Sequence, residues 1–296
     1  MSLVINHNLM AMNAARNLSS SYGSLSTSVR RLSSGLRVGA ASDDAAGLAI
    51  RELMRSDIAA LNQGVRNAND AISLIQTADG ALGVIDEKLI RMKELAEQAA
   101  TGTYTSDQRL IIDSEYQAMA SEITRIANST DFNGIHLLNG NLSGATHDGS
   151  GLVSTGKLKV HFGSANDCSE DYYYIRIGTS TASALGVGSQ AAEGKGKSIS
   201  TQSAAQAALE GIENAIISKD KIRANLGALQ NRLENTISNL QIQSENLQAA
   251  ESRISDVDVS SEMTEFTRQQ ILTQAAVAML SQANSLPRMA MQLLGG

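Results

Sequence analysis

The side chains best able to do chemistry are scattered along this chain. Its four histidines are His7, His136, His147 and His161, and none belongs to a His-Glu-x-x-His motif that would hold zinc on a helix. The single cysteine, Cys168, excludes an intramolecular disulfide and a Cys-x-x-Cys zinc site. The sequence also lacks a glycine-rich phosphate loop. We therefore expect no catalytic residues, no metal and no cofactor, and a protein that is not an enzyme.

The adjacent carboxylates of Asp43 and Asp44 could hold a cation, but their position favours a structural role. They follow Ser42 and two glycines, Gly35 and Gly39, and they precede a new helical pattern. The free amides and the positive dipole end of a helix favour hydroxyl and acidic side chains at its start. We therefore interpret Asp43 and Asp44 as the beginning of a helix.

The segment before this break has the spacing of a coiled-coil helix. From Ala11 to Leu36, apolar residues follow one another at alternating steps of four and three, an average of about 3.5 that is typical of a helix-helix seam. A last helix, from Met263 to Leu294, carries a second seam of smaller residues. One helix cannot bury a seam alone, so we expect the two ends of the chain to pair and then to bind other copies. The predicted assembly seam consists of Leu18, Tyr22, Leu25, Val29, Leu32, Leu272, Ala276, Met279, Leu280, Ala283 and Leu286.

Helical patterns fill most of the remaining chain. A long helix is predicted over residues 44–100, and Thr105-x-x-Gln108 has the form of a capping box that opens another. A further helix is predicted from about residue 201 to 255, where polar Thr236 and Gln243 interrupt a regular seam and could fix its register.

The middle of the chain changes from helical to strand-like patterning. Two runs that alternate with period two, at residues 158–162 and 173–177, predict a β-hairpin. The expected fold is therefore mainly α: a long antiparallel coiled-coil or bundle rod with paired N- and C-termini, and a small β-hairpin region in the middle of the chain.

Composition limits the remaining classes of function. The chain has 296 residues with 3% aromatics, no tryptophan and one proline, which suits narrow helix-helix seams better than a thick globular core. Its net charge of -6 argues against nucleic acid as a partner. No apolar run reaches the roughly 18 residues of a membrane span, so no membrane insertion is expected. The N-terminus also lacks the basic and apolar regions of a cleavable signal peptide.

A series of short motifs occurs in order at both ends of the chain. They are Ile5-Asn-His-Asn-Leu9, Leu32-Ser-Ser-Gly-Leu-Arg37, Asp43-Asp-Ala-Ala-Gly-Leu-Ala-Ile50, the segment from Asn67 to Ala78, Phe132-Asn-Gly134, Ser252-Arg-Ile-Ser-Asp256, Gln270-Ile-Leu-Thr-Gln-Ala275, Ala283-Asn-Ser-Leu-Pro287 and Leu293-Leu294. With these motifs the chain resembles bacterial flagellin over nearly its whole length. Its short central region resembles a minimal member of that family, with little or no outer domain.

The resemblance implies a division of the chain into three regions. Residues 1–42 and 257–296 would be terminal helices of an inner tube, which in flagellins become ordered on polymerisation. Residues 43–140 and 200–256 would form a helical rod body. Residues 141–199 would be a short β-hairpin and loop region in place of outer domains.

The resemblance also implies a function and partners. The protein would be a structural subunit that polymerises into the flagellar filament for swimming motility, and it would be extracellular after type III export without a cleavable signal peptide. Its partners would be further copies of itself, an export chaperone on the C-terminal helices, and cap and hook-associated proteins. Serine and threonine residues between Asn139 and Ser200 would be candidates for O-linked sugars.

A vertebrate Toll-like receptor is a further implied partner. Flagellins that it recognises carry a body-helix motif that resembles the segment from Ile90 to Glu97, with a glutamate from the next helix. Carried over by position, this gives Arg91, Leu95 and Glu115 as candidate contacts. Glu97 departs from the better-known motif, which has an apolar residue there.

Two other classes of protein remain as alternatives. A hook-filament junction protein would share the terminal architecture. A membrane-inserting type III translocator would also be helical and without a signal peptide, but it would need a long apolar span.

Overall fold

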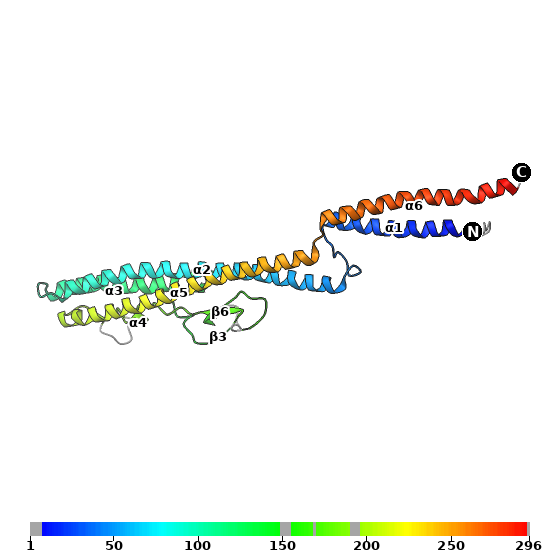
Figure 1. Ribbon diagram of the computed structural model, residues 1–296. Coiled ribbons are helices and arrows are strands. Elements are labelled where there is room, and N and C mark those ends of the chain that lie inside the picture. The colour runs from blue at the N-terminus through cyan, green and yellow to red at the C-terminus, as the bar shows by residue number, and fades with distance from the viewer. Residues whose placement is uncertain (1–7, 149–154, 168–169, 190–195, 295–296) are drawn as a thin grey trace. The chain divides into compact units, whose positions relative to one another are not determined.

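The computed structural model describes residues 8–148, 155–167, 170–189 and 196–294, and it is mainly helical (Figure 1). Its helices are α1 (Leu9–Ser34), α2 (Ala45–Ala100), α3 (Ser106–Ser129), α4 (Ala182–Leu185), α5 (Gln202–Ser255) and α6 (Val259–Leu294). Its strands are β1 (Asp131–Phe132), β2 (Ile135–His136), β3 (His147–Asp148), β4 (Thr155–Gly156), β5 (Leu158–His161) and β6 (Tyr172–Ile175). The strands pair antiparallel as β1-β2, β3-β4 and β5-β6. The expected mainly helical fold with paired ends and a central hairpin region is confirmed.

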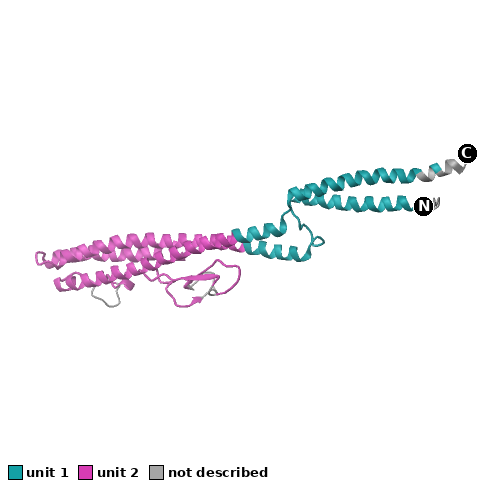
Figure 2. Ribbon diagram, viewed as in Figure 1, with its two compact units in different colours: residues 1–58, 245–296 teal, residues 59–244 magenta. Residues whose placement is uncertain are grey.

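The chain forms two compact units (Figure 2). The first unit combines both ends of the chain, residues 1–58 and 245–296, and the second comprises residues 59–244. The divisions between the units fall inside α2 and α5, whereas the limits carried over from flagellins, at residues 42 and 257, lie in the connections between helices. Helices α2 and α5 therefore each contribute residues to both units.

The second unit has a continuous apolar core along α2, α3 and α5. Buried residues on α2 repeat every seven positions, as Leu61, Ala68, Ile75, Leu82, Leu89 and Ala96. All of them except Leu61 belong to one cluster with Ile123 of α3 and Leu226 of α5. Because a heptad repeat keeps one stripe of a helix facing its neighbours, α2 can bury this stripe over its whole length in the unit.

The β5-β6 hairpin closes one side of this core. Its register pairs Leu158 with Ile175 and Val160 with Tyr173, as the alternating sequence pattern predicts. The end of β5 approaches α2 so closely that a Cβ on Gly64 would lie 2.0 Å from the carbonyl oxygen of Phe162. Only glycine fits at this point of α2.

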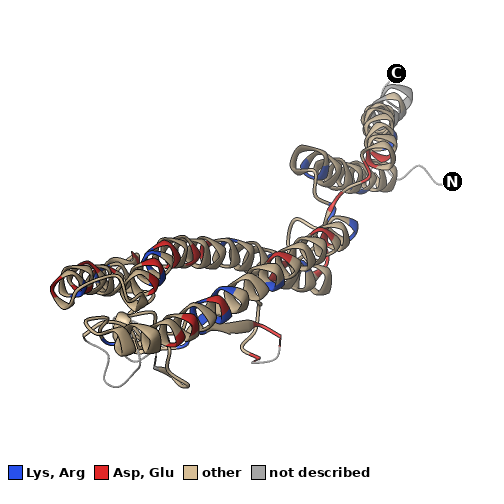
Figure 3. Ribbon diagram, turned by 90° about the vertical axis from the view of Figure 1, so that its left-hand side faces the viewer, with Lys and Arg blue, Asp and Glu red and all other residues tan. Residues whose placement is uncertain are grey.

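Charged residues are interspersed along the long helices (Figure 3). Within the described residues, no helix is long and apolar enough to span a bilayer.

Candidate assembly surface

Helices α1 and α6 pair antiparallel in the first unit. At one end, the Asn8 side chain accepts a hydrogen bond from the Ala11 amide at 3.0 Å and so caps α1, while its Nδ2 donates to the Ala283 carbonyl at 2.7 Å. At the other end, Arg31 lies 3.6 Å from the carboxylate of Glu262. Rising residue numbers on α1 therefore meet falling numbers on α6.

Only one row of the predicted assembly seam lies within this helix pair. On α1, Leu18, Leu25 and Leu32 are half-buried at intervals of seven residues. On α6, Ala276 and Leu280 are half-buried and Ala283 is buried. We call these six residues the inner row.

The other row of the seam faces away from the pair. Tyr22 and Val29 on α1 are 57% and 49% exposed, and Leu272 and Met279 on α6 are 46% and 62% exposed. We call these four residues the outer row. The predicted seam thus divides in two, because two helices can bury only the stripe along which they touch. Leu286 continues the spacing of the outer row, but its side chain lies outside the part that the structure describes.

Further large apolar side chains surround the outer row. The exposed ones on α1 and α6 are Leu9, Met10, Met12, Val259, Met263, Ile271, Val277 and Met289. A groove of about 380 Å³ along the α1–α6 pair is lined by apolar Met10, Ala14, Ala276 and Met279 together with amides such as Asn17. Soluble monomers rarely leave so much apolar side-chain surface in contact with water. This surface therefore has the character of an unfilled protein-protein interface.

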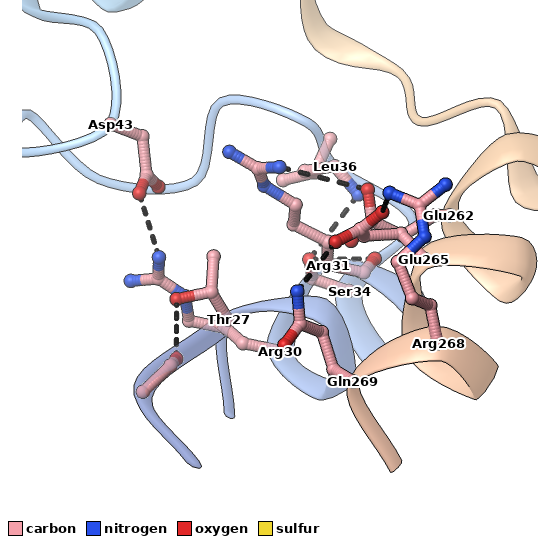
Figure 4. A network of polar contacts seen from close by, with 11 residues as sticks. Thr27, Arg30, Arg31, Ser34, Leu36, Asp43, Glu262, Glu265, Arg268 and Gln269 are labelled. Carbon is pink, nitrogen blue, oxygen red and sulfur yellow. Dashed lines mark hydrogen bonds and ion pairs between the residues drawn. The ribbon is translucent and has the colours of Figure 1, made fainter. Parts of the chain in front are cut away.

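Polar contacts form a joint where α1 ends and α6 begins, and Figure 4 shows those of Arg30, Arg31 and Glu262. Gly35 ends α1 in the left-handed conformation, with φ of 72°. Leu36 then forms an antiparallel bridge with Asp256, in which the Arg37 amide donates to the Ser255 carbonyl at 2.6 Å. The Arg37 guanidinium adds a hydrogen bond to the Ile254 carbonyl at 2.7 Å. The connection after α1 is thus bound to the connection before α6.

The two adjacent aspartates take different structural roles in this joint. Asp44 precedes α2 and accepts a hydrogen bond from the Gly47 amide at 2.9 Å, as expected of a helix start. Asp43 instead binds the Ala40 amide and pairs with Arg30 at 2.7 Å. Burial acts to raise the pKa of Asp43, but the hydrogen bond and charge of Arg30 with the loop amides outweigh it, so the pKa lies below its usual value.

A second exposed surface lies on α2 and α3 of the other unit. Arg91 on α2 contacts Glu115 of α3 at 2.8 Å and Glu94 of its own helix at 2.9 Å. These carboxylates raise the pKa of Arg91. Leu95, the third candidate receptor contact, is 1% exposed and belongs to the core. The structure therefore brings Arg91 and Glu115 together on the surface and turns the Leu95 side chain away from it.

The chemistry-bearing residues form no metal centre in the part of the chain that the structure describes. No group of three or more histidine, cysteine, aspartate or glutamate side chains there could hold an ion. His7 and Cys168 lie outside the described residues. His147 and His161 lie near tyrosines of the β5-β6 hairpin, a grouping that the sequence analysis did not identify.

Known families match both ends of the chain. The bacterial flagellin N-terminal helical region matches residues 5–143, and the bacterial flagellin C-terminal helical region matches residues 209–294. A flagellin of Halalkalibacterium halodurans is 44% identical over 292 residues, which cover 99% of this chain and 100% of that protein. The flagellar filament 33 kDa core protein of Treponema phagedenis is 42% identical with the same coverage.

A solved structure has a similar fold. A putative flagellar hook-associated protein from Vibrio parahaemolyticus has a TM-score of 0.54 and 14% identity, covering 72% of this chain and 100% of that one. At this identity the likeness concerns the fold alone.

Proposed function

The chain belongs to the bacterial flagellin family, and from this premise we propose that it polymerises by burying the outer row of α1 and α6 against neighbouring copies. It is a structural subunit of the bacterial flagellar filament, an extracellular organelle. We propose that the outer row of α1 and α6 is the surface that holds the subunits together. The proposal rests on one observation, which is that four apolar side chains of the paired helices α1 and α6 are exposed. They are those of the outer row, Tyr22, Val29, Leu272 and Met279.

Burial of these side chains would supply the free energy of assembly. Transferring one large apolar side chain from water to a packed interface is worth roughly 1.5 to 3 kcal/mol. The outer row and its exposed neighbours therefore offer enough surface to offset the ordering of the terminal helices. We propose that residues 1–42 and 257–296 form the inner tube of the filament and that residues 43–140 and 200–256 form its body.

The route to the filament is part of the same proposal. We propose export through the flagellar type III apparatus without a cleavable signal peptide. An export chaperone would cover the exposed apolar residues of the C-terminal helix before assembly, and cap and hook-associated proteins would contact the same helices at the filament ends. The exposure of Ile271, Leu272 and Val277 supports the chaperone contact.

The first experiment compares two aspartate substitutions on α6. Leu272→Asp places a charge in the outer row, and we expect it to abolish filaments or raise the critical concentration at least about tenfold. Gln274→Asp places the same charge at another exposed position of α6 and serves as the matched control. Electron microscopy and sedimentation measure assembly, and circular dichroism checks that the monomers keep equal helicity. Normal filaments from the Leu272 variant would contradict the proposal.

The alternative of a hook-filament junction protein has less support. The relatives that match this chain over 99% of its length at 40–44% identity include flagellins and filament core proteins. The hook-associated structure shares the fold at 14% identity and therefore does not favour that role over filament formation.

Recognition by a vertebrate Toll-like receptor is a separate proposal. The exposed pair of Arg91 and Glu115 supports it, because exposed arginines often dominate protein-protein contacts. Leu95 would act only by holding α2 in the core, since its side chain is buried.

Reporter cells exposed to monomeric protein test this role. Arg91→Ala is expected to weaken signalling about tenfold or more. Lys93→Ala, which removes an exposed cation from the same helix, is the matched control and should leave signalling unchanged. Equal signalling by the wild-type protein and the Arg91 variant would reject the assignment.

A further inference from the structure

The β5-β6 hairpin gathers aromatic side chains in a chain that has few. Of six tyrosines and three phenylalanines, Tyr172, Tyr173, Tyr174 and Phe162 belong to this hairpin or its first turn residue. One face of the hairpin is directed toward the helices. There Tyr173 packs edge-on against Phe162 with 4.6 Å between ring centroids, and Arg232 of α5 covers its ring at 3.6 Å.

The opposite face is partly exposed and carries cations and rings. We call it the open face and define it by Lys157, Lys159, His161, Tyr172 and Tyr174. The Nζ of Lys159 lies 3.7 Å from the ring centroid of Tyr172, and the Nζ of Lys157 lies 4.2 Å from that of Tyr174. His161 stacks near Tyr172 with centroids 6.0 Å apart. All five side chains are partly exposed.

The two lysines hold their charges without acidic partners among the described residues. Their ammonium groups lie over tyrosine rings, and Lys159 also donates to the Asn166 side chain at 3.4 Å. A cation over a ring gains only about 0.5–1 kcal/mol at an exposed site. An anion that binds here would therefore displace no carboxylate of the described residues from Lys157 or Lys159. In a chain of net charge -6, this local positive character is unusual.

A groove adjoins the open face along β5. It has a volume of about 330 Å³ and lies between α2, the β1-β2 hairpin and β5. Phe132 and Leu158 contribute apolar lining, Asp70 and Asn133 contribute polar groups, and Lys159 borders both the groove and the open face. A concave apolar surface with a few converging polar groups is typical of sites for small ligands.

We propose that the open face and this groove bind an acidic polysaccharide made of uronic acids. Its carboxylates would pair with Lys157 and Lys159, the C–H faces of its rings would stack on Tyr172 and Tyr174, and its hydroxyls would donate to Asp70. Aromatic rings offer an apolar surface with a polar end, which suits the amphipathic faces of sugar rings. An acidic segment of a second copy could also pair with the lysines, but it would not supply sugar rings that stack on Tyr172 and Tyr174 while their hydroxyls donate to Asp70.

The test measures binding of full-length monomer by titration calorimetry. The probes are an alginate oligosaccharide, neutral dextran, and poly-glutamate of matched length and charge. We expect binding of alginate, none of dextran, and at least tenfold weaker binding of poly-glutamate. The double variant Lys157→Gln/Lys159→Gln should weaken alginate binding at least tenfold. The control Lys88→Gln/Lys93→Gln removes the same charge from α2 and should not.

A third variant separates a saccharide site from simple charge attraction. Asp70→Ala, at an exposed position of α2, removes a negative charge. It should weaken alginate binding if Asp70 accepts sugar hydroxyls, whereas stronger binding would overturn the proposal. Equal binding of poly-glutamate and alginate, or no alginate binding, would overturn it as well. Filament formation by the lysine double variant should be normal, which keeps this test independent of the assembly proposal.

Discussion

The most informative single residue is Lys219, because a lysine occupies a position of the α5 seam that apolar residues otherwise fill. It precedes Leu226, Leu233 and Leu240 at intervals of seven, and all four are buried. Its ammonium group contacts Asp86 of α2 at 2.6 Å and Asp220 at 2.7 Å. A buried polar pair between two helices can fix their relative register. We infer that Lys219 and Asp86 do so here.

The residues predicted to fix this register do not. The hydroxyl of Thr236 bonds the Arg232 carbonyl of its own helix at 2.9 Å, and Gln243 is exposed. Thr236 thus satisfies its hydroxyl within its own helix. That expectation was wrong because spacing along one helix does not tell which stripe faces a partner.

Substitution of Asp86 tests the role of the buried lysine. Asp86→Ala leaves the ammonium of Lys219 with only Asp220, and we expect it to lower the free energy of unfolding by about 2–3 kcal/mol, below the full cost of an uncompensated buried charge. Lys219→Met replaces the cation by an apolar side chain of similar length and leaves a partly hydrated Asp86. It should change stability by less than about 1 kcal/mol. Urea titration monitored by circular dichroism measures both, and an equal loss in the two variants would contradict the inference.

At the scale of elements, the start of α3 shows how far local sequence determines structure. Thr105 accepts a hydrogen bond from the Gln108 amide, and the Gln108 side chain accepts one from the Thr105 amide. The predicted capping box is thereby confirmed. Such a motif needs only two residues that are three positions apart, so it can be identified without knowledge of the fold.

The capping box predicts a measurable contribution to stability. Thr105→Ala removes the acceptor at the start of α3, and we expect a loss of about 1 kcal/mol in the free energy of unfolding. Thr77→Ala is the matched control, because Thr77 is exposed inside α2 and its hydroxyl bonds the Ser73 carbonyl. Alanine favours a helix interior, so this control should be neutral or slightly stabilising. A loss of similar size at both positions would show that capping is not the cause.

At the scale of the whole molecule, the two units differ in how much of their apolar surface they bury. The unit of residues 59–244 contains the large core cluster, with Leu82, Ile85 and Leu89 fully buried. Among the described residues of the paired helices α1 and α6, Ala283 is the apolar side chain that is buried, the rest of the inner row is half-buried, and the outer row is exposed. The first arrangement is typical of a domain that folds alone, and the second is typical of one that is completed by neighbours.

The sequence by itself determined the helices, the break after α1, the capping box, the hairpin and the family. Each of these depends on spacing within a short segment or on motifs in order along the chain, and such signals survive without tertiary information. The heptad seam of α1 was visible in the same way.

Only the tertiary structure decided which side of each seam is buried. Leu18 and Tyr22 follow the same spacing, yet one faces α6 and the other faces water. Leu95 and Arg91 lie one helical turn apart, yet only Arg91 is exposed. The lysines and tyrosines of the open face belong to two segments that are brought together by the pairing of β5 with β6. The physical reason is the same in each case: burial depends on which elements pack together in space, and periodicity within one element specifies a stripe but not its partner.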